Sequence, residues 1–285
     1  MQRRAWGLIA FAIVALLIPV HAAYWKHILS FPPVYSDHGA GVQRMLNFTI
    51  GATGLFLLAG HVALALLVLW FTLRPPRTVH PVPERTARRW AWLPGLLFAV
   101  AAEGGVLVLG LPVWGKYYGP PPQDALQIEV TGRQFFWVIR YPGADGQFGE
   151  TYADRIMRGT ITADDPGPCQ ITPDNPIGIC TDDPHARDDI FTLNEMAVPV
   201  NRPVMVILRS MDVIHSFFLP QFRVKQDAVP GMRIRIWFVP QQTGQFEIVC
   251  NHICGLGHYR MRGFIYVMSA SEFQDWIAEQ PTLME

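Results

Sequence analysis

The chain has few charged side chains, and their scarcity excludes several classes of protein. Only 16% of its 285 residues are Asp, Glu, Lys or Arg, whereas 50% are hydrophobic. A typical soluble domain has roughly 25% charged residues, so this composition favours partial burial in a membrane. The four cysteines are too few for a disulfide-dense secreted scaffold. A formal net charge of zero gives no basic excess, and we expect no nucleic-acid partner.

The few charges are unevenly distributed along the chain. Residues 1–112 hold nine Lys/Arg against three Asp/Glu, a net +6, whereas residues 113–285 hold fourteen against twenty, a net −6. A basic, apolar half followed by an acidic, polar half suggests a membrane anchor that carries a water-exposed domain.

Three apolar segments lie in the first half, at residues 5–23, 50–73 and 90–113. The second and third are long enough to cross a bilayer core as helices, which takes about 20 residues. The loop between them contains five arginines and one acid, which places it in the cytoplasm by the positive-inside rule. The second half of the chain is therefore expected outside. The charged residues of this loop are Arg74, Arg77, Glu84, Arg85, Arg88 and Arg89.

The first segment has two interpretations. Arg3 and Arg4, the apolar run and the small residues around Ala22 fit a cleavable signal peptide. Tyr24, Trp25 and Lys26 fit the interfacial end of a retained helix, which is the interpretation we favour. Residues 1–25 are thus expected to form a transmembrane helix or signal peptide, followed by a transmembrane hairpin at 40–113.

Glu103 is an acid within the third apolar segment. Ionisable residues at membrane depth are often functional, so a proton-handling role is one hypothesis. A hydrogen bond to a partner subunit is the alternative.

The pattern changes after Pro120, and short β-rich runs separated by turn residues predict an all-β sandwich or barrel over 120–285. The expected strands are 126–139, 204–209, 232–239, 245–249 and 263–267. A capping-box pattern at Ser271 predicts a short terminal helix to about Glu279.

An insertion at about 142–190 interrupts the strand rhythm and is rich in Pro, Gly and Asp. Between Asp164 and Asp189 it has seven acids and one Arg, which indicates either a solvated face or an acidic docking rim for a basic partner. Cys169 and Cys180 lie in it; outside the membrane they could form a disulfide, and free thiols are the alternative.

Five metal-binding side chains are concentrated within twelve residues, and a sixth, His215, lies upstream. The short segment contains Cys250, His252, Cys254, His258 and Met261. Thiolate, imidazole and thioether together favour copper in a redox role, and zinc rarely takes Met. A mononuclear blue-copper site uses one Cys, whereas two cysteines here can bridge a pair of metals. His215 and His258 would then supply one imidazole to each metal, with Met261 and a backbone carbonyl in weak axial positions.

At this point residues from about 40 to 280 resemble cytochrome c oxidase subunit II, with a cupredoxin-like CuA domain behind a transmembrane hairpin. The strongest parts of the resemblance are Ser210–Met232 and Cys250–Met261. It implies a binuclear copper (CuA) centre in which His252 contributes its backbone carbonyl. Asp212 and Ser216 would orient His215. The implied side-chain ligands are His215, Cys250, Cys254, His258 and Met261.

Two residues depart from the family pattern. His252 stands where the family usually has Glu, whose carboxylate also reaches a Mg or Mn ion at the subunit interface. That second metal is therefore unsupported here: it is absent, or imidazole substitutes. Phe135 stands where the family has its electron-entry Trp, while Trp137 matches the second Trp. Both remain electron-entry candidates, and no catalytic residue is expected in this chain.

The resemblance implies an electron-entry subunit of a proton-translocating respiratory oxidase in the bacterial inner membrane, with its copper domain on the periplasmic side. Expected partners are a haem-containing catalytic subunit I, which reduces O2, membrane lipid, and cytochrome c or a bound c-type cytochrome as donor. The donor is expected to be separate because the sequence has no Cys-x-x-Cys-His. A CuA subunit of a nitric oxide reductase is the alternative. A quinol oxidase subunit would not need these ligands, and two bridging thiolates argue against a copper carrier.

Overall fold

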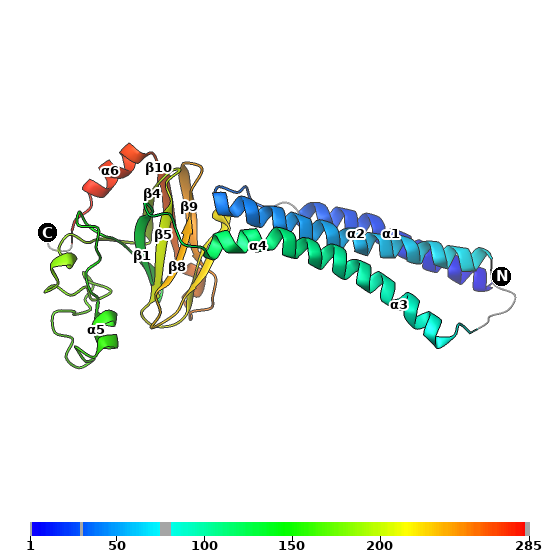
Figure 1. The fold of residues 1–285 in the computed structure, drawn as a ribbon, viewed down its shortest axis with the longest axis horizontal. Coiled ribbons are helices and arrows are strands. Elements are labelled where there is room, and N and C mark those ends of the chain that lie inside the picture. Colours follow the sequence, from blue (N-terminus) through cyan, green and yellow to red (C-terminus); the bar gives the residue numbers. More distant parts are fainter. Residues whose placement is uncertain (1, 29–30, 75–80, 283–285) are drawn as a thin grey trace. The chain divides into compact units, whose positions relative to one another are not determined.

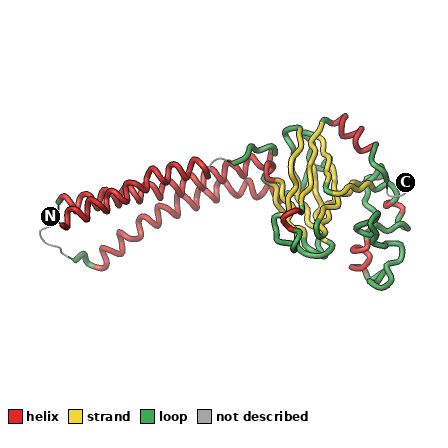
Figure 2. The backbone as a smooth tube through the Cα atoms, turned by 180° about the vertical axis from the view of Figure 1, so that it is seen from behind, coloured by secondary structure: helices red, strands yellow, loops and turns green. Residues whose placement is uncertain are grey.

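A computed structural model describes residues 2–28, 31–74 and 81–282 of the chain. They form two compact units: residues up to 32 with 42–113, and residues 33–41 with 114–285. The first unit is helical and the second is mostly β, as Figures 1 and 2 show.

Long apolar helices make up the helical unit. They are α1 (Gln2–Ile28), α2 (Asp37–Leu73), α3 (Glu84–Phe98), a π-helical segment (Ala99–Glu103) and α4 (Gly104–Tyr118). The ends of two of them, residues 37–41 of α2 and 114–118 of α4, belong to the second unit. Three stretches in them are long and apolar enough to cross a membrane: Arg4–Tyr24, Asp37–Leu73 and Glu84–Tyr118. The three predicted apolar segments lie within these helices, because a helix satisfies its own backbone hydrogen bonds where water is absent.

Glu103 ends the π-helical segment, and its side chain is exposed on the helical unit. A π-helical turn inside an α-helix often accompanies a functional position. Neither the proton-handling role nor the contact with a partner is decided by this geometry, and both stay predictions.

The β unit is a sandwich of two five-stranded sheets, which confirms the predicted fold class. The sheet orders are β3-β2-β1-β5-β8 and β4-β10-β9-β6-β7. Buried aliphatic and aromatic side chains from both sheets form one core. The strands are β1 (Leu126–Arg133), β2 (Phe136–Tyr141), β3 (Ile190–Leu193), β4 (Glu195–Pro199), β5 (Val204–Ser210), β6 (His215–Leu219), β7 (Val224–Ala228), β8 (Ile234–Phe238), β9 (Gly244–Cys250) and β10 (Arg262–Met268).

Two local expectations are wrong. The run 126–139 was expected as one strand, but it folds into the antiparallel hairpin β1–β2, with Arg133 opposite Phe136. The turn has no Gly, Pro or Asn signal; instead the carboxylate of Asp212 accepts a hydrogen bond from Gln134 N at 2.7 Å, which is a long-range contact. The terminal helix α6 (Ala270–Ala278) is capped by Ser269 rather than Ser271, because Ser269 forms the reciprocal pair of hydrogen bonds with Glu272.

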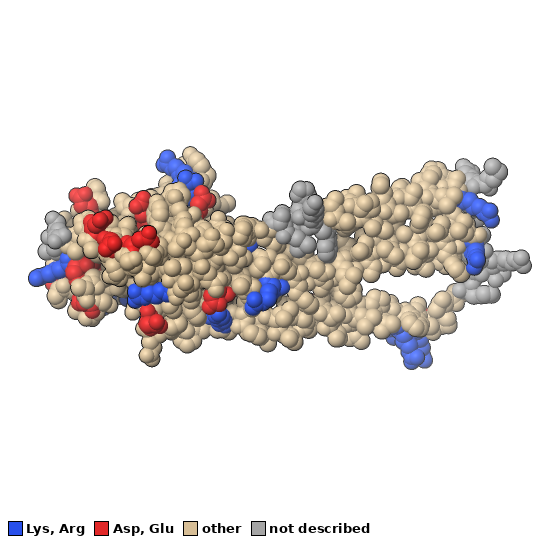
Figure 3. Space-filling view, turned by 90° about the horizontal axis from the view of Figure 1, so that it is seen from above, with Lys and Arg blue, Asp and Glu red and all other residues tan. Residues whose placement is uncertain are grey.

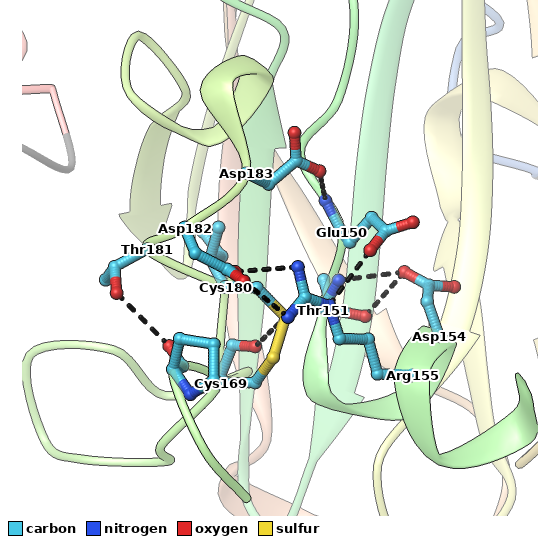
Figure 4. Close-up of a disulfide and its surroundings, with 12 residues drawn as sticks. Glu150, Thr151, Asp154, Arg155, Cys169, Cys180, Thr181, Asp182 and Asp183 are labelled. Carbon is cyan, nitrogen blue, oxygen red and sulfur yellow. Dashed lines mark hydrogen bonds and ion pairs between the residues drawn. A yellow bond between two sulfur atoms is a disulfide. The ribbon is translucent and has the colours of Figure 1, made fainter. Parts of the chain in front are cut away.

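The insertion is an ordered segment closed by a disulfide (Figure 4). The sulfur atoms of Cys169 and Cys180 are bonded and both residues are buried, which confirms the predicted disulfide. Helix α5 (Tyr152–Arg158) lies beside it, and Arg155 pairs with Glu150 at 2.9 Å and with Asp182 at 2.6 Å. Several acids of the insertion are therefore neutralised within it.

Buried ion pairs join the insertion to the sandwich. Arg140 on β2 contacts Glu129 on β1 at 2.7 Å and Asp189 at 2.9 Å, and all three side chains are fully buried. Arg209 on β5 contacts Glu129 at 3.3 Å and Asp154 of α5 at 2.8 Å. Burial raises the pKa of Asp189 to about 7 against the opposing effect of Arg140. Burial would also raise the pKa of Glu129, but Arg140, Arg209 and Arg233 hold it below its usual value.

We expect Arg140→Met to lower the free energy of unfolding by about 3–5 kcal/mol, because it leaves two buried carboxylates without their shared cation. The loss should be larger at pH 8 than at pH 5. With Arg140 in place the pKa of Asp189 is already about 7 and that of Glu129 is below its usual value. Without Arg140 both pKa values should rise, so the folded variant holds protons that the folded wild-type chain releases, and the loss grows as pH rises.

Chemical denaturation of the full chain, followed by near-UV circular dichroism, measures this difference. The matched control is Arg235→Met, which removes an exposed arginine from β8 and should change stability by less than about 0.5 kcal/mol. Equal effects of the two substitutions would show that the buried network does not stabilise the fold.

Candidate metal centre

Two strands of one sheet bring the distant ligand candidates together. His215 is the first residue of β6, and Cys250 is the last residue of β9. These strands pair antiparallel, with Phe217 opposite Cys250. Asn251 N donates to Ser216 O at 3.0 Å, and Cys250 N donates to Met261 O at 3.2 Å. The sheet therefore fixes both ends of the 251–261 loop beside His215.

The donor atoms of this loop and of His215 lie close together. The sulfurs of Cys250 and Cys254 are 3.9 Å apart and unbonded. His215 Nδ1 lies 4.0 Å from Cys250 Sγ, and His258 Nδ1 lies 3.6 Å from Cys254 Sγ. Met261 Sδ lies 3.7 Å from Cys254 Sγ. The structure thus brings all five predicted side-chain donors to one place, and each thiol has its own imidazole.

Four of the five donor side chains are shielded from solvent, and the fifth, His258, is half-buried. His215 is 0% exposed, Met261 2%, Cys254 3% and Cys250 8%. The ligand atoms of His215, Cys250 and Cys254 lie within 4.8 Å of one another, a spacing that can hold a metal ion. Low exposure limits exchange with water, which suits a site that keeps its metal.

The two thiols differ in acidity. Burial acts to raise the pKa of Cys250, but the neighbouring His215 side chain and the backbone of Ser216 and His252 outweigh it and lower this pKa. Burial raises the pKa of Cys254, and the nearby charge of Cys250 raises it further. The pair therefore releases one proton readily and holds the second. A bound cation would remove that second proton, because metals bind the thiolate form.

Asp212 orients the imidazole of His215. Its Oδ1 lies 2.7 Å from His215 Nε2, and a carboxylate only accepts, so Nε2 carries the hydrogen and Nδ1 presents its lone pair toward Cys250. The expected orienting role of Asp212 agrees with this contact. Ser216 does not share it: its buried hydroxyl has no hydrogen-bond partner, and only its backbone carbonyl contacts the loop.

Gln134 is a positioning residue that no sequence pattern singles out. Its Nε2 donates to Cys254 O at 2.6 Å, and its backbone N donates to Asp212 Oδ2 at 2.7 Å. It therefore connects the metal-ligand loop to the carboxylate that orients His215. No local sequence pattern indicates this connection, because Gln134, Asp212 and Cys254 are far apart in the chain.

The two aromatic candidates for electron entry both line the cluster. Trp137 is fully buried, and its ring centroid lies 5.9 Å from that of His215. Phe135 lies against the loop glycines: a Cβ on Gly257 would be 2.3 Å from Phe135 Cδ2, and one on Gly255 would be 3.1 Å from Phe135 Cε1. Gly255 also has φ +133°, a conformation that L side chains rarely adopt. These glycines allow the Phe135 ring to cover the loop.

His252 differs from the other candidates. Its carbonyl oxygen lies 3.2 Å from Cys250 Sγ, whereas its side chain is exposed. The geometry therefore offers the cluster a backbone oxygen at this position and leaves the imidazole outside it.

Large apolar side chains project from the same loop. Ile253 is 80% exposed, Tyr259 85% and Leu256 97%. Exposed apolar groups beside a buried polar cluster are typical of an interaction surface. In the view of Figure 3, most acidic and basic side chains lie over the β unit, and few lie along the helices.

The donor set restricts the metal. Hard cations such as Mg²⁺ and Ca²⁺ require oxygen ligands, which this cluster offers only as one carbonyl. Two thiolates, two imidazoles and a thioether fit copper, and paired thiols 3.9 Å apart can be shared between two ions. The residues present therefore fit a copper pair.

The comparisons with known proteins all match subunit II of cytochrome c oxidase. A family model described as "Cytochrome C oxidase subunit II, periplasmic domain" matches residues 181–268. The chain is 34% identical over 277 residues to the alternative cytochrome c oxidase subunit 2 of Bradyrhizobium diazoefficiens, covering 96% of this chain and 92% of that relative. It is 29% identical over 256 residues to cytochrome c oxidase subunit 2 of Cereibacter sphaeroides, covering 86% and 79%.

A solved structure is also similar in sequence. The periplasmic domain of subunit II of cytochrome oxidase from Bradyrhizobium japonicum shares 31% identity, with a TM-score of 0.38, over 56% of this chain and 95% of that one. The relative from Bradyrhizobium diazoefficiens is matched along nearly the full length of both chains, which includes the helices as well as the sandwich. The chain therefore belongs to the cytochrome c oxidase subunit II family.

Proposed function

We propose that this chain is the electron-entry subunit of a respiratory haem–copper oxidase and that its donor cluster holds a binuclear copper centre, CuA. The observation that carries the proposal is the convergence of two unbonded buried thiols, two imidazole Nδ1 atoms and one thioether. When bound, the copper pair supplies uptake and release of single electrons.

Each residue of the cluster has a separate role in holding this centre. The copper pair would be held by the thiolates of Cys250 and Cys254, the imidazoles of His215 and His258, the thioether of Met261 and the backbone carbonyl of His252. Asp212 and Gln134 keep His215 and the loop in place before metal arrives. A site whose ligands barely move between oxidation states transfers electrons with little reorganisation, and burial in a rigid sandwich favours this.

The partners follow from family membership and from the surface. We place the membrane hairpin at 40–113 and the copper domain, with its insertion, at 120–285 on the periplasmic side of a bacterial plasma membrane. The chain takes electrons from cytochrome c or a bound c-type cytochrome and delivers them to haem in catalytic subunit I, where O2 reduction is coupled to proton translocation. The exposed side chains of Ile253, Leu256 and Tyr259 offer an apolar contact beside the centre. The relatives' names favour an oxidase over the nitric oxide reductase alternative.

Replacing either thiol tests the ligand set. Cys250→Ser and Cys254→Ser should each abolish the mixed-valence electron paramagnetic resonance spectrum of a shared copper pair, because a hydroxyl does not bridge copper as a thiolate does. Metal analysis of the full chain should show copper lost or reduced to a single weakly bound ion. The control is Asn251→Ser at an exposed neighbouring position. A mixed-valence spectrum in either cysteine variant would overturn the assignment.

The two loop histidines should behave differently. His252→Ala should keep its copper, because only the carbonyl of residue 252 faces Cys250. His258→Ala should weaken copper binding by more than about 100-fold, since changes that only perturb a ligand's surroundings already cost about 10–100-fold. Competition with a copper chelator measures both. Copper loss in His252→Ala would show that its imidazole is a ligand.

The insertion provides a test of donor docking. Asp164 and Asp165 are exposed acids of the insertion. If the insertion attracts a basic donor, Asp164→Asn/Asp165→Asn should slow electron uptake at low salt and flatten its salt dependence. Stopped-flow reduction by cytochrome c measures the rate. Asp275→Asn/Glu279→Gln removes the same charge from the α6 region and should have a smaller effect; an equal effect would remove the docking role of the insertion.

A further inference from the structure

Two histidines face each other inside the helical unit, away from the copper cluster. The ring centroids of His21 on α1 and His61 on α2 are 4.8 Å apart, with an interplanar angle of 48°. Both lie at membrane depth: His61 is twelve residues from the end of α2 at Leu73, roughly 18 Å along the helix, and no Asp, Glu, Lys or Arg occurs within 5–24 or 45–73. Such residues within membrane helices usually pair with one another and are functional.

Backbone contacts fix the same tautomer in both rings. His21 Nδ1 lies 2.7 Å from Leu17 O, and His61 Nδ1 lies 2.8 Å from Leu57 O. A carbonyl oxygen only accepts, so each Nδ1 carries the hydrogen and each neutral ring has its lone pair on Nε2. This is the arrangement of a metal-binding imidazole, whose second nitrogen commonly donates to a backbone carbonyl.

Two rings in this state cannot hydrogen-bond to each other, because both Nε2 atoms are acceptors. An acceptor without a donor is unfavourable in hydrocarbon. A cation bound by both Nε2 atoms would give each of the two lone pairs a partner.

We propose that His21 and His61 form an intramembrane binding site for a single transition-metal ion, copper(I). Imidazole suits copper and zinc, whereas the neighbouring apolar helices offer no carboxylate for a hard cation. The energy of placing an ion in lipid rises with the square of its charge, which favours the monovalent ion. Copper(I) also accepts coordination by two ligands, whereas protein zinc sites normally use four.

One of the two rings borders a cavity. This cavity of about 370 Å³ is apolar apart from His21, and it is lined by residues of α1 and α2: Ile18, His21, Ala22, Gly51, Gly54, Leu55 and Leu58. The glycines lack side chains that would fill this space. The His21 ring therefore borders a cavity on an otherwise apolar helix pair.

Copper(I) uptake by the full chain in lipid nanodiscs tests the site. The background is Cys250→Ser/Cys254→Ser, so that binding does not depend on the proposed outer centre. Titration against a chelator should show one tightly bound copper(I) per chain, and His21→Leu or His61→Leu should each weaken it by at least about tenfold. His185→Leu, at a half-buried histidine of the insertion, should leave it unchanged.

Further measurements distinguish copper(I) binding at the two histidines from misfolding and from binding elsewhere. His61→Met should retain copper(I), because a thioether is a soft donor, which also shows that the substituted helix still folds. X-ray absorption should detect nitrogen neighbours alone in the unsubstituted pair. Uptake that is unaffected by the leucine substitutions, tighter binding of zinc than of copper(I), or a purified chain whose mass shows cleavage after His21 would each overturn the proposal.

Discussion

The pairing of β6 with β9 is the constraint on which the metal cluster depends. Phe217 lies opposite Cys250 and Phe218 opposite Val249, so His215 meets a cysteine that follows it by 35 residues. No local preference of the 251–261 loop could bring these groups together. The sheet register, set by the burial of alternate side chains in the sandwich core, therefore determines which donor atoms face each other.

The 251–261 loop is also held by a segment outside these two strands. The β1–β2 turn carries Gln134 and Phe135 onto the loop, one by hydrogen bonds and the other by packing over glycines. Asp212 receives hydrogen bonds from both Gln134 and His215. The donor atoms are thus held by three separate segments, and none of them belongs to the insertion. The insertion is attached to the sandwich through Arg140 and Arg209, and through an apolar cluster that includes Val138, Ile177 and Ile179.

Much of this architecture can be read from the sequence, for identifiable reasons. Apolar runs are nearly uninterrupted, so the three long helices follow from length alone. The density of Cys, His and Met in 250–261 indicates a metal site without any knowledge of the fold.

The hairpin turn at Gln134 could not be found in this way, because the carboxylate that holds it lies at position 212. The Ser269 cap was missed for a smaller reason: Ser269 and Ser271 both precede Glu272, and only the backbone path of β10 decides between them. The unbonded hydroxyl of Ser216 likewise depends on packing that no pattern reveals.

The four cysteines end in opposite chemical states within one folded unit. Cys169 and Cys180 are joined, whereas the sulfurs of Cys250 and Cys254 stay 3.9 Å apart. An S–S bond is about 2 Å long, so a side-chain movement of that size would join the second pair as well. Any environment oxidising enough to close the insertion threatens to close the metal pair before it is loaded. Formation of the two pairs would therefore have to be ordered in time: Cys169 and Cys180 are oxidised, while Cys250 and Cys254 are kept as thiols until the proposed copper pair binds.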